Sequence, residues 1–491
     1  MPSYAVVTFG CQMNQHDSDR IGEVLRRSGY EEAADPERAD LVLLNTCSVR
    51  EKAEQKLRSE VGRLGQLKRE RPDLIIGVAG CLAQQEGNKL LSRMPQIDFL
   101  IGPDHILDLP RALHELEQGG PPRAHVGFDL DEPEFLAARP EPGRVGVTAF
   151  VTVMKGCDER CSFCIVPTTR GPERYRPARQ IVDEIESLVA LGVREVTLLG
   201  QTVNSYVDPE QALRAVPGQT PDESQFAALI RAIAERVPTL ARLRYTSPHP
   251  RHLTPALIAA HAELPLLPRH VHLPVQSGSD RVLKRMIRRY NRQEYCTRVT
   301  ALRNVVPGLT LSTDVIVGFP GETEEDFEAT LSLVREIGFT GLFGFKYSPR
   351  PGTPALKLGD DIPEQEKSER LERLFRVSEA IRQEHLNSLV GAELEVLVEG
   401  RGKGDDFTGR SERNEIVHVS AGGLDPTGRV VRVRVEKAYK NSLAGVLLDR
   451  LPRVPASVIP ARPAAPLAAR SELAPNDAVD PSPRRALPIV L

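Results

Sequence analysis

Three cysteines within eight residues constrain this chain more than any other feature of its sequence. Cys157, Cys161 and Cys164 follow directly after the apolar run at residues 149–154, which predicts a buried strand. The Cys-x3-Cys-x2-Cys spacing places three thiols on one short loop, one ligand short of a closed zinc or ferredoxin site. Three cysteines without a fourth nearby would leave one iron of a [4Fe-4S] cluster open to a substrate. The alternative, three ordinary core residues, leaves the density of cysteines in one loop unexplained.

The composition indicates a soluble globular protein of several domains. The 491 residues are too many for one ordinary core, and 40% hydrophobic with 27% charged residues is typical of soluble chains. No run approaches the roughly 18 apolar residues of a membrane helix, and residues 1–10 lack the pattern of a signal peptide. Seven cysteines, an odd number, fit ligands in a reducing compartment better than a disulfide framework. We therefore expect a cytoplasmic protein with no membrane partner.

Residues 3–120 alternate strand and helix patterns. Apolar runs at 4–8, 41–45 and 74–79 predict buried parallel strands. Amphipathic patterns at 18–27 and 49–68 predict helices between them. This alternation predicts an α/β domain with a doubly wound parallel sheet.

A second set of three cysteines is spread over this first domain. Cys11, Cys47 and Cys81 each come a few residues after a predicted strand. Open α/β sheets bind ligands outside the carboxyl ends of their strands, so the three thiols should converge at that edge. The alternative is three independent buried cysteines, a common location for this residue. The sequence therefore predicts a second three-thiol site, assembled by the fold.

These motifs resemble known families. With Phe163 before its last cysteine, the Cys157 loop resembles the signature of radical S-adenosylmethionine (radical SAM) enzymes. The resemblance implies a cluster whose open iron binds S-adenosylmethionine, which is cleaved to a 5′-deoxyadenosyl radical. Together with Phe-Gly-Cys11-Gln-Met-Asn, Asn-Thr-Cys47-Ser-Val-Arg and Gly-Cys81, the loop resembles the methylthiotransferase family. That resemblance implies a second, auxiliary [4Fe-4S] cluster on the first three cysteines, which provides the sulfur.

The segment from 121 to 143, rich in proline and acidic residues, is predicted to be a linker. Residues 144–378 then repeat strand and helix patterns. Including the strand before Cys157, the repeats predict six βα units and a partial (βα)6 barrel, with its chemistry at the C-terminal ends of the strands. The further predicted strands are at 193–199, 243–246, 270–273, 309–317 and 341–347.

Loops at those strand ends provide the candidate cofactor contacts. Gly200 and Gln201 occupy the place of the radical SAM Gly-Gly-Glu motif, although the acidic residue of the motif is missing here. Ser247, Gln276 and Gly318 lie in the following loops, where support of the barrel rim is an equally good interpretation. His249, His270 and His272 are also near the rim, but we assign them no role, and Cys296 is interpreted as a packing residue.

RNA contacts would have to come from local patches, because the net charge is −3. Residues 280–303 carry eight basic and two acidic side chains, and either a phosphate-binding surface or a solvated helix face explains this. From 392 to 449 short strands follow, and Arg432 and Arg434 alternate with valines as on a sheet with one cationic face. Within residues 379–450, this small β-barrel resembles a TRAM domain, an RNA-binding module. The tail, 451–491, is predicted to be disordered.

The resemblance implies a substrate and partners. The motifs around Cys11, Cys47 and Pro274 are most similar to family members that modify the isopentenylated adenosine beside the anticodon of tRNA. Such an enzyme, expected here as a monomer, would need a tRNA anticodon loop, an electron donor such as flavodoxin or ferredoxin, and a sulfur source. Threonylcarbamoyl-adenosine in tRNA and an aspartate of a ribosomal protein are the alternative substrates within the family. A scaffold that binds RNA or iron–sulfur clusters without catalysis is the alternative from another class.

Overall fold

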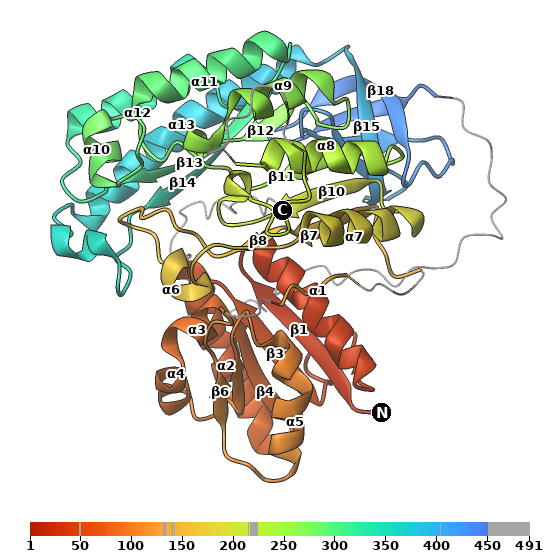
Figure 1. Ribbon diagram of the computed structural model, residues 1–491, viewed down its shortest axis with the longest axis vertical. Helices are drawn as coiled ribbons and strands as arrows, with labels where there is room; N and C mark the ends of the chain where they lie inside the picture. Colours follow the sequence, from red (N-terminus) through yellow and green to blue (C-terminus); the bar gives the residue numbers. More distant parts are fainter. Residues whose placement is uncertain are drawn as a thin grey trace, which may run out of the picture.

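Six parallel strands form the centre of the N-terminal domain, red to orange in Figure 1. The computed structural model describes residues 1–48, 51–130, 134–138, 141, 143–214, 216, 224–402 and 404–449. The strand order is β2-β1-β3-β4-β5-β6. Their bounds are β1 (Ser3–Phe9), β2 (Glu31–Glu32), β3 (Leu41–Thr46), β4 (Ile75–Gly80), β5 (Phe99–Ile101) and β6 (Arg123–His125).

Helices cover both faces of this sheet. One apolar cluster joins the sheet to α1 and α5, and another joins its opposite face to α2, α3 and α4. The predicted doubly wound parallel sheet is therefore confirmed. The helices are α1 (Gln12–Arg27), α2 (Glu51–Glu70), α3 (Cys81–Glu86), α4 (Asn88–Arg93), the short η1 (Ile106–Asp108) and α5 (Leu109–Glu117). The predicted start of the second helix, at residue 49, lies outside the described residues.

The predicted linker at 121–143 begins too early. Strand β6 lies inside it and pairs in parallel with β5, so the sheet extends beyond residue 120. Its Arg-Ala-His sequence has no apolar pattern, which is why the sequence gives no sign of a strand there. Residues 131–133, 139, 140 and 142 of the predicted linker lie outside the described part of the chain.

The central domain contains the six predicted strands of the partial barrel, arranged as two parallel three-stranded sheets. Their orders are β11-β10-β7 and β12-β13-β14, and a single apolar cluster spans both. The strands are β7 (Thr148–Thr152), β10 (Glu195–Leu199), β11 (Arg242–Tyr245), β12 (His270–His272), β13 (Thr310–Val317) and β14 (Gly341–Lys346). The helices around them are α7 (Ala178–Ala190), α8 (Phe226–Arg236), α9 (Pro255–Glu263), α10 (Asp280–Arg285), α11 (Arg292–Val305) and α12 (Glu324–Ile337). The short helices are η2 (Val203–Ser205), η3 (Pro250–His252) and η4 (Pro354–Leu358).

The sequence of residues 279–303 has one continuous helical pattern, which predicts a single helix, but the structure has two helices there, α10 and α11. Ile287 and Arg289 adopt left-handed backbone conformations between α10 and α11. Asn291 then caps α11, because its side chain accepts a hydrogen bond from the Glu294 N–H while the Glu294 carboxylate accepts one from the Asn291 N–H. This break carries Arg288 into the interior of the domain, where only 5% of its surface is exposed.

A long helix, α13 (Glu364–Ser388), leads to a closed five-stranded barrel in blue at the upper right of Figure 1. The barrel consists of β15 (Glu393–Arg401), β16 (Phe407–Ser411), β17 (Ile416–Ser420), β18 (Val430–Ala438) and β19 (Leu443–Leu447). The predicted alternation is confirmed on β18, where Arg432 and Arg434 are exposed and Val431, Val433 and Val435 are buried. The predicted disordered tail lies outside the described residues. Among those described, no helix combines the length and apolarity needed to cross a membrane.

Candidate metal centres

The fold brings Cys11, Cys47 and Cys81 to one edge of the N-terminal sheet. Phe9 at the end of β1 pairs with Thr46 at the end of β3, and Thr46 pairs with Gly80 at the end of β4. Each cysteine comes one or two residues after an aligned strand end, so the three loops meet at the carboxyl edge. Register between neighbouring strands is therefore what assembles this site.

Hydrogen bonds between two asparagines join the first two cysteine loops. The Asn45 amide donates to the Asn14 carbonyl oxygen at 2.8 Å, and the Asn14 amide donates to the Asn45 side-chain oxygen at 3.2 Å. The Cys11 thiol donates to the Asn14 Oδ1 atom, with 3.4 Å between the two atoms. Gly80, before Cys81, has φ +91°, and a Cβ there would lie 2.4 Å from Asn45 Oδ1. Only glycine fits this position without strain.

The thiols at this edge are close enough to influence one another. A hydrogen bond with Cys47 is the largest cause that lowers the pKa of Cys11 to about 6, against the opposing effect of burial. Burial raises the pKa of Cys81, and the positive charge of Arg170 opposes that rise. No described cysteine forms a disulfide, although Cys11 and Cys47 are in hydrogen-bonding contact.

The second site lies on the loop that follows β8 (Met154–Lys155). Strand β8 pairs in antiparallel fashion with β9 (Arg174–Tyr175), and the chain between them carries Cys157, Cys161, Cys164 and the short helix α6 (Val166–Arg170). Gly156 has φ +80°, and a Cβ there would lie 1.8 Å from the Pro172 carbonyl oxygen. A glycine with left-handed backbone thus precedes a cysteine at both sites.

Burial has the largest effect on the pKa of two thiols in this loop. It raises the pKa of Cys157 to about 11 and that of Cys164 to about 12, in both cases as the largest cause. Cys157 Sγ lies 2.8 Å from the Thr202 hydroxyl oxygen, and the electrostatic interaction with the nearby Cys161 adds to the rise in the pKa of Cys164. The three side chains of the loop therefore lie near one another, as the spacing predicts.

Two buried arginines donate to thiols, one at each site, and the sequence reasoning missed both. The Arg288 Nη1 atom lies 3.3 Å from Cys161 Sγ, and its Nη2 atom donates to the Pro274 carbonyl oxygen at 3.2 Å. The Arg170 Nε atom lies 3.3 Å from Cys81 Sγ. Arg288 was hidden in a segment interpreted as a basic surface, and Arg170 stands in a Thr-Thr-Arg-Gly stretch without a distinctive pattern. Its place six residues after Cys164 was the available signal.

Three of the predicted cofactor contacts lie in the cysteine loop or in the loop that follows β10. Phe163 is half-buried against the cluster that contains Met286 and Phe319. Gly200 follows β10, and a Cβ there would lie 2.5 Å from the Met154 side chain. The Gln201 side chain has a buried oxygen without a hydrogen-bond partner among the described residues. A buried amide oxygen of this kind is suited to receive a polar ligand.

The other three predicted contacts lie at successive strand ends. Ser247 follows β11 and Gln276 follows β12, and both have left-handed backbones, with φ +57° and +72°. Non-glycine residues in this conformation are strained, and such strain clusters at functional sites. Gly318 follows β13, where its N–H donates to the Glu322 carboxylate at 2.7 Å. Among the described contacts, none joins these three residues to a cysteine, so their direct role stays a prediction.

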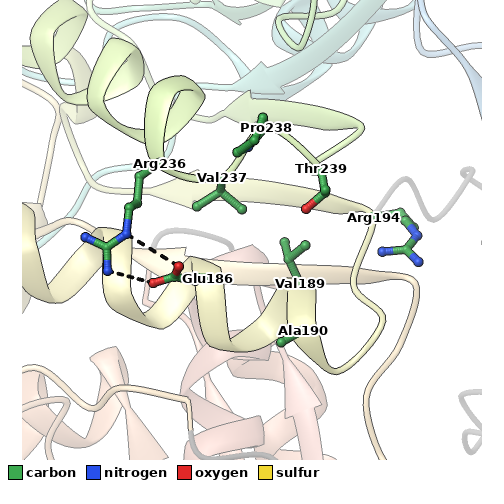
Figure 2. A pocket seen from close by; sticks show the side chains of 8 residues that line it. All are labelled: Glu186, Val189, Ala190, Arg194, Arg236, Val237, Pro238 and Thr239. Carbon is green, nitrogen blue, oxygen red and sulfur yellow. Dashed lines mark hydrogen bonds and ion pairs between the residues drawn. The ribbon is translucent and has the colours of Figure 1, made fainter.

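The residues to which the sequence assigned no role lie elsewhere or have structural partners. Cys296 packs on α11 against the barrel core, with its thiol 3.6 Å from the Glu336 carboxylate. The His272 ring bonds the Ser312 hydroxyl at 2.9 Å on the neighbouring strand. His249 is buried, and its Nε2 atom has no partner in the described structure. The groove drawn in Figure 2, between α7 and the end of α8, contains none of these residues.

The basic side chains of 280–303 are mostly engaged within the protein. Arg281 pairs with Asp326, and Arg292 pairs with Glu336. The Arg303 side chain donates to the Ile337 carbonyl oxygen at 2.5 Å. Together with Arg288, these contacts remove much of the free positive charge that a phosphate-binding surface would need. The solvated-face interpretation is also incomplete, because part of the segment is buried.

The donor sets fit iron–sulfur clusters. Thiolates are the soft ligands that such clusters require, and three of them at each site leave one coordination position for another ligand. Arginine donors beside Cys81 and Cys161 would offset the negative charge of a bound cluster. The unpartnered Gln201 oxygen is a buried polar group on the residue next to Thr202, whose hydroxyl lies 2.8 Å from Cys157 Sγ.

Comparison with protein families divides the chain in the same order. Residues 3–102 match "Uncharacterized protein family UPF0004", residues 151–334 match the "Radical SAM superfamily" and residues 387–448 match the "TRAM domain". A radical SAM domain implies a [4Fe-4S] cluster and S-adenosylmethionine as cofactors. The predicted radical SAM and TRAM resemblances are confirmed.

Curated relatives match over 90% or more of the chain. A tRNA-2-methylthio-N(6)-dimethylallyladenosine synthase of Sorangium cellulosum is 61% identical, covering 100% of this chain and 99% of the relative. A protein of the same name from Geobacter sulfurreducens is 48% identical, covering 90% and 97%. Among solved structures, the radical SAM methyltransferase TsrM from Kitasatospora setae has a TM-score of 0.53 at 15% identity, covering 82% of this chain and 79% of that one, which shows the fold alone. The chain therefore belongs to the radical SAM methylthiotransferases, in the family of the tRNA-2-methylthio-N(6)-dimethylallyladenosine synthases.

Proposed function

We propose that this chain adds a methylthio group to carbon 2 of an isopentenylated adenosine beside the anticodon of tRNA. It would use two molecules of S-adenosylmethionine and sulfur derived from a second cluster. The observation that carries this proposal is the presence of two three-thiol sites, one on each side of a domain boundary. Helix α6, which follows the second site, packs against α3, which begins with Cys81 of the first. A radical generator alone would need only the second site.

In this proposal Cys157, Cys161 and Cys164 hold the radical cluster. With S-adenosylmethionine bound, that cluster would supply the radical that removes hydrogen from the substrate carbon. The candidate contacts to the cofactor are the loop aromatic residue and the strand-end residues, namely Phe163, Gly200, Gln201, Ser247, Gln276 and Gly318. The strained backbones of Ser247 and Gln276 and the unpartnered oxygen of Gln201 support these assignments.

Cys11, Cys47 and Cys81 hold the auxiliary cluster, which would be the second [4Fe-4S] cluster of the protein. The strand register that brings their loops together supports this assignment. The contact between Cys11 and Cys47 and the arginine beside Cys81 support it further, because both favour the thiolate form that metals bind.

The division into two sites suits the chemistry. An aromatic C–H bond without an acidic proton cannot be opened by a general base, so the protein contributes position and exclusion of water rather than acid–base catalysis. The burial of Cys157, Cys161 and Arg288 provides a water-poor site. The target base has to leave its stack to reach a site inside the barrel, and a single-stranded loop permits this at modest cost.

The proposal includes partners outside the chain. The anticodon loop of tRNA would contact the TRAM barrel, whose strand β18 has an exposed row containing Arg432 and Arg434. A donor such as flavodoxin or ferredoxin would reduce the radical cluster, and a sulfur source would restore the auxiliary one. The protein would act as a monomer in the cytoplasm.

Nucleoside analysis of tRNA tests the substrate. In cells that lack this protein, the methylthio derivative of isopentenyladenosine should disappear while isopentenyladenosine itself accumulates. Expression of the chain should restore the modified base. Loss of methylthiolation from threonylcarbamoyl-adenosine, with the isopentenylated base unchanged, would contradict the proposal.

A further inference from the structure

Arg170 lies at the boundary between the two three-thiol sites. It is the last residue of α6, the helix that begins two residues after Cys164, and only 4% of its surface is exposed. Helix α6 packs against α3, the helix that starts with Cys81, and both lie where the two domains meet in Figure 1. Arg170 therefore belongs to the central domain in sequence but reaches the N-terminal site.

The guanidinium group makes two contacts in the N-terminal domain. Its Nη2 atom donates to the Asp17 carboxylate at 2.6 Å, and its Nε atom points at Cys81 Sγ at 3.3 Å. Burial, the largest single cause, would raise the pKa of Asp17, but the charge of Arg170 and the contacts with His16 and Arg170 together lower it to about 2. The ion pair is therefore charged and buried, and it holds the Arg170 guanidinium group against the Cys81 thiol.

The domain boundary does not depend on Arg170 alone. Arg174 pairs with Asp104 and donates to the Asp129 carbonyl oxygen at 2.7 Å, while Lys155 contacts Asp104 at 3.0 Å. Both basic residues come from the central domain, and Asp104 lies beyond β5 of the N-terminal one. These ion pairs already hold the two domains together. Docking of the domains therefore does not explain why Arg170 contacts the Cys81 thiol.

The geometry points to Arg170 as a positioning residue for the auxiliary centre, donating a charge-assisted hydrogen bond to the Cys81 thiolate across the domain boundary. This inference depends on the proposed function, because it assumes that Cys81 holds a cluster. Net charge and hydrogen bonds to the sulfurs set the reduction potential of such clusters. A cationic donor stabilises the reduced, more negative state, so Arg170 should raise the potential of the auxiliary cluster. The centre would also be complete only when the two domains are docked.

The test compares two full-length variants that lack the radical site, with Cys157, Cys161 and Cys164 changed to Ala so that only one cluster contributes to the spectra. Asp17→Asn breaks the buried ion pair and keeps the arginine beside Cys81. Asp17→Asn combined with Arg170→Gln also removes the donor charge and leaves no buried charge unpaired. Iron content, thermal unfolding and the midpoint potential, followed by electron paramagnetic resonance, are measured for both.

We expect both variants to bind about four irons per chain, as one [4Fe-4S] cluster requires. The double variant should have the lower potential, and Arg170→Lys in the same background should lie nearer to the variant that keeps Arg170. If the midpoint potential were the same with and without the Arg170→Gln change, at equal iron content, the role of Arg170 would be overturned, while the auxiliary centre itself would still stand. A negative shift of similar size in Arg174→Gln, which breaks a boundary ion pair without touching a thiol, would also overturn the role of Arg170. Absence of iron from the chain that lacks only the radical cysteines would overturn the auxiliary centre itself, and this inference with it.

Discussion

The two three-thiol sites are built by different means. The radical site draws Cys157, Cys161 and Cys164 from one loop, whereas the auxiliary site draws its cysteines from three loops separated by more than thirty residues each. The pKa of Cys11 is lowered to about 6 by its contact with Cys47, while burial raises those of Cys157 and Cys164 to about 11 and 12. Each site nevertheless has one buried arginine beside one thiol.

This difference indicates how each site can fail. The local loop keeps its ligands together through backbone spacing, and it needs the barrel to bury it. The N-terminal site needs correct strand register, the Asn14–Asn45 pair and, through Arg170, contact with the other domain. A change at one site should therefore leave the cysteines of the other in place.

The largest effect is expected from Cys161→Ala. Removing one of three ligands should abolish the radical cluster, so cleavage of S-adenosylmethionine and methylthiolation should both fall below detection. Iron should drop from about eight to about four per chain, because one [4Fe-4S] cluster remains. Iron analysis and the yield of 5′-deoxyadenosine check this. Cys296→Ala is the matched control and should keep both activities, since that thiol packs against the barrel core away from the other six.

Cys47→Ala should separate the two activities. Iron is again expected to fall to about half, and methylthiolation should be lost, but S-adenosylmethionine should still be cleaved at the intact radical site. The measurement is 5′-deoxyadenosine formed by the reconstituted variant, with tRNA nucleosides analysed in parallel. Full retention of iron would refute the assignment of Cys47 as a ligand.

The thiols should differ in reactivity in the metal-free protein. Cys11 and Cys164 are both partly exposed, but a thiol with a pKa of about 6 is mostly thiolate at pH 7, whereas one with a pKa of about 12 is neutral. Iodoacetamide at pH 7 should label Cys11 at least about tenfold faster. Lowering the pH from 7 to 5 should slow the labelling of Cys11 by about tenfold, because its thiolate is protonated below its pKa. Peptide mass spectrometry gives both rates, and equal labelling would contradict the electrostatic difference.

A small effect is expected outside both sites. Arg434→Gln on the exposed face of β18 should weaken tRNA binding by roughly two- to fivefold and reduce the salt dependence by about one ion, as for loss of a single phosphate contact. Arg281→Gln is the comparison, because Arg281 is held by the buried Asp326 carboxylate and should not contribute to binding, whereas Arg434 pairs at 3.7 Å with Glu393, which is exposed. Filter binding at several salt concentrations measures both. If Arg281 had the larger effect, the RNA surface would lie on the central domain instead.

Much of the fold follows from local pattern. The apolar runs before Cys11, Cys47 and Cys81 predicted strands correctly. The reason is clearest for β3 and β4, since strands buried on both faces need continuous apolar residues. Alternation on β18 likewise predicted which side chains face water. Strand β6 escaped prediction, since a three-residue edge strand is defined by pairing with β5 rather than by its own residues. The break between α10 and α11 escaped because a basic helical pattern continues across it.

What the sequence determined by itself was the chemistry and the order of the parts: six thiols in two sets, each placed after a strand, followed by a small β-barrel with a cationic face. Spacing along the chain carries this information because loops after parallel strands share one edge of the sheet. Only the tertiary structure decided which side chains complete the sites. Arg170 and Arg288 reach Cys81 and Cys161 from positions 89 and 127 residues away in sequence. Such contacts depend on the docking of helices and domains, so the position of an arginine along the chain does not reveal which thiol it reaches.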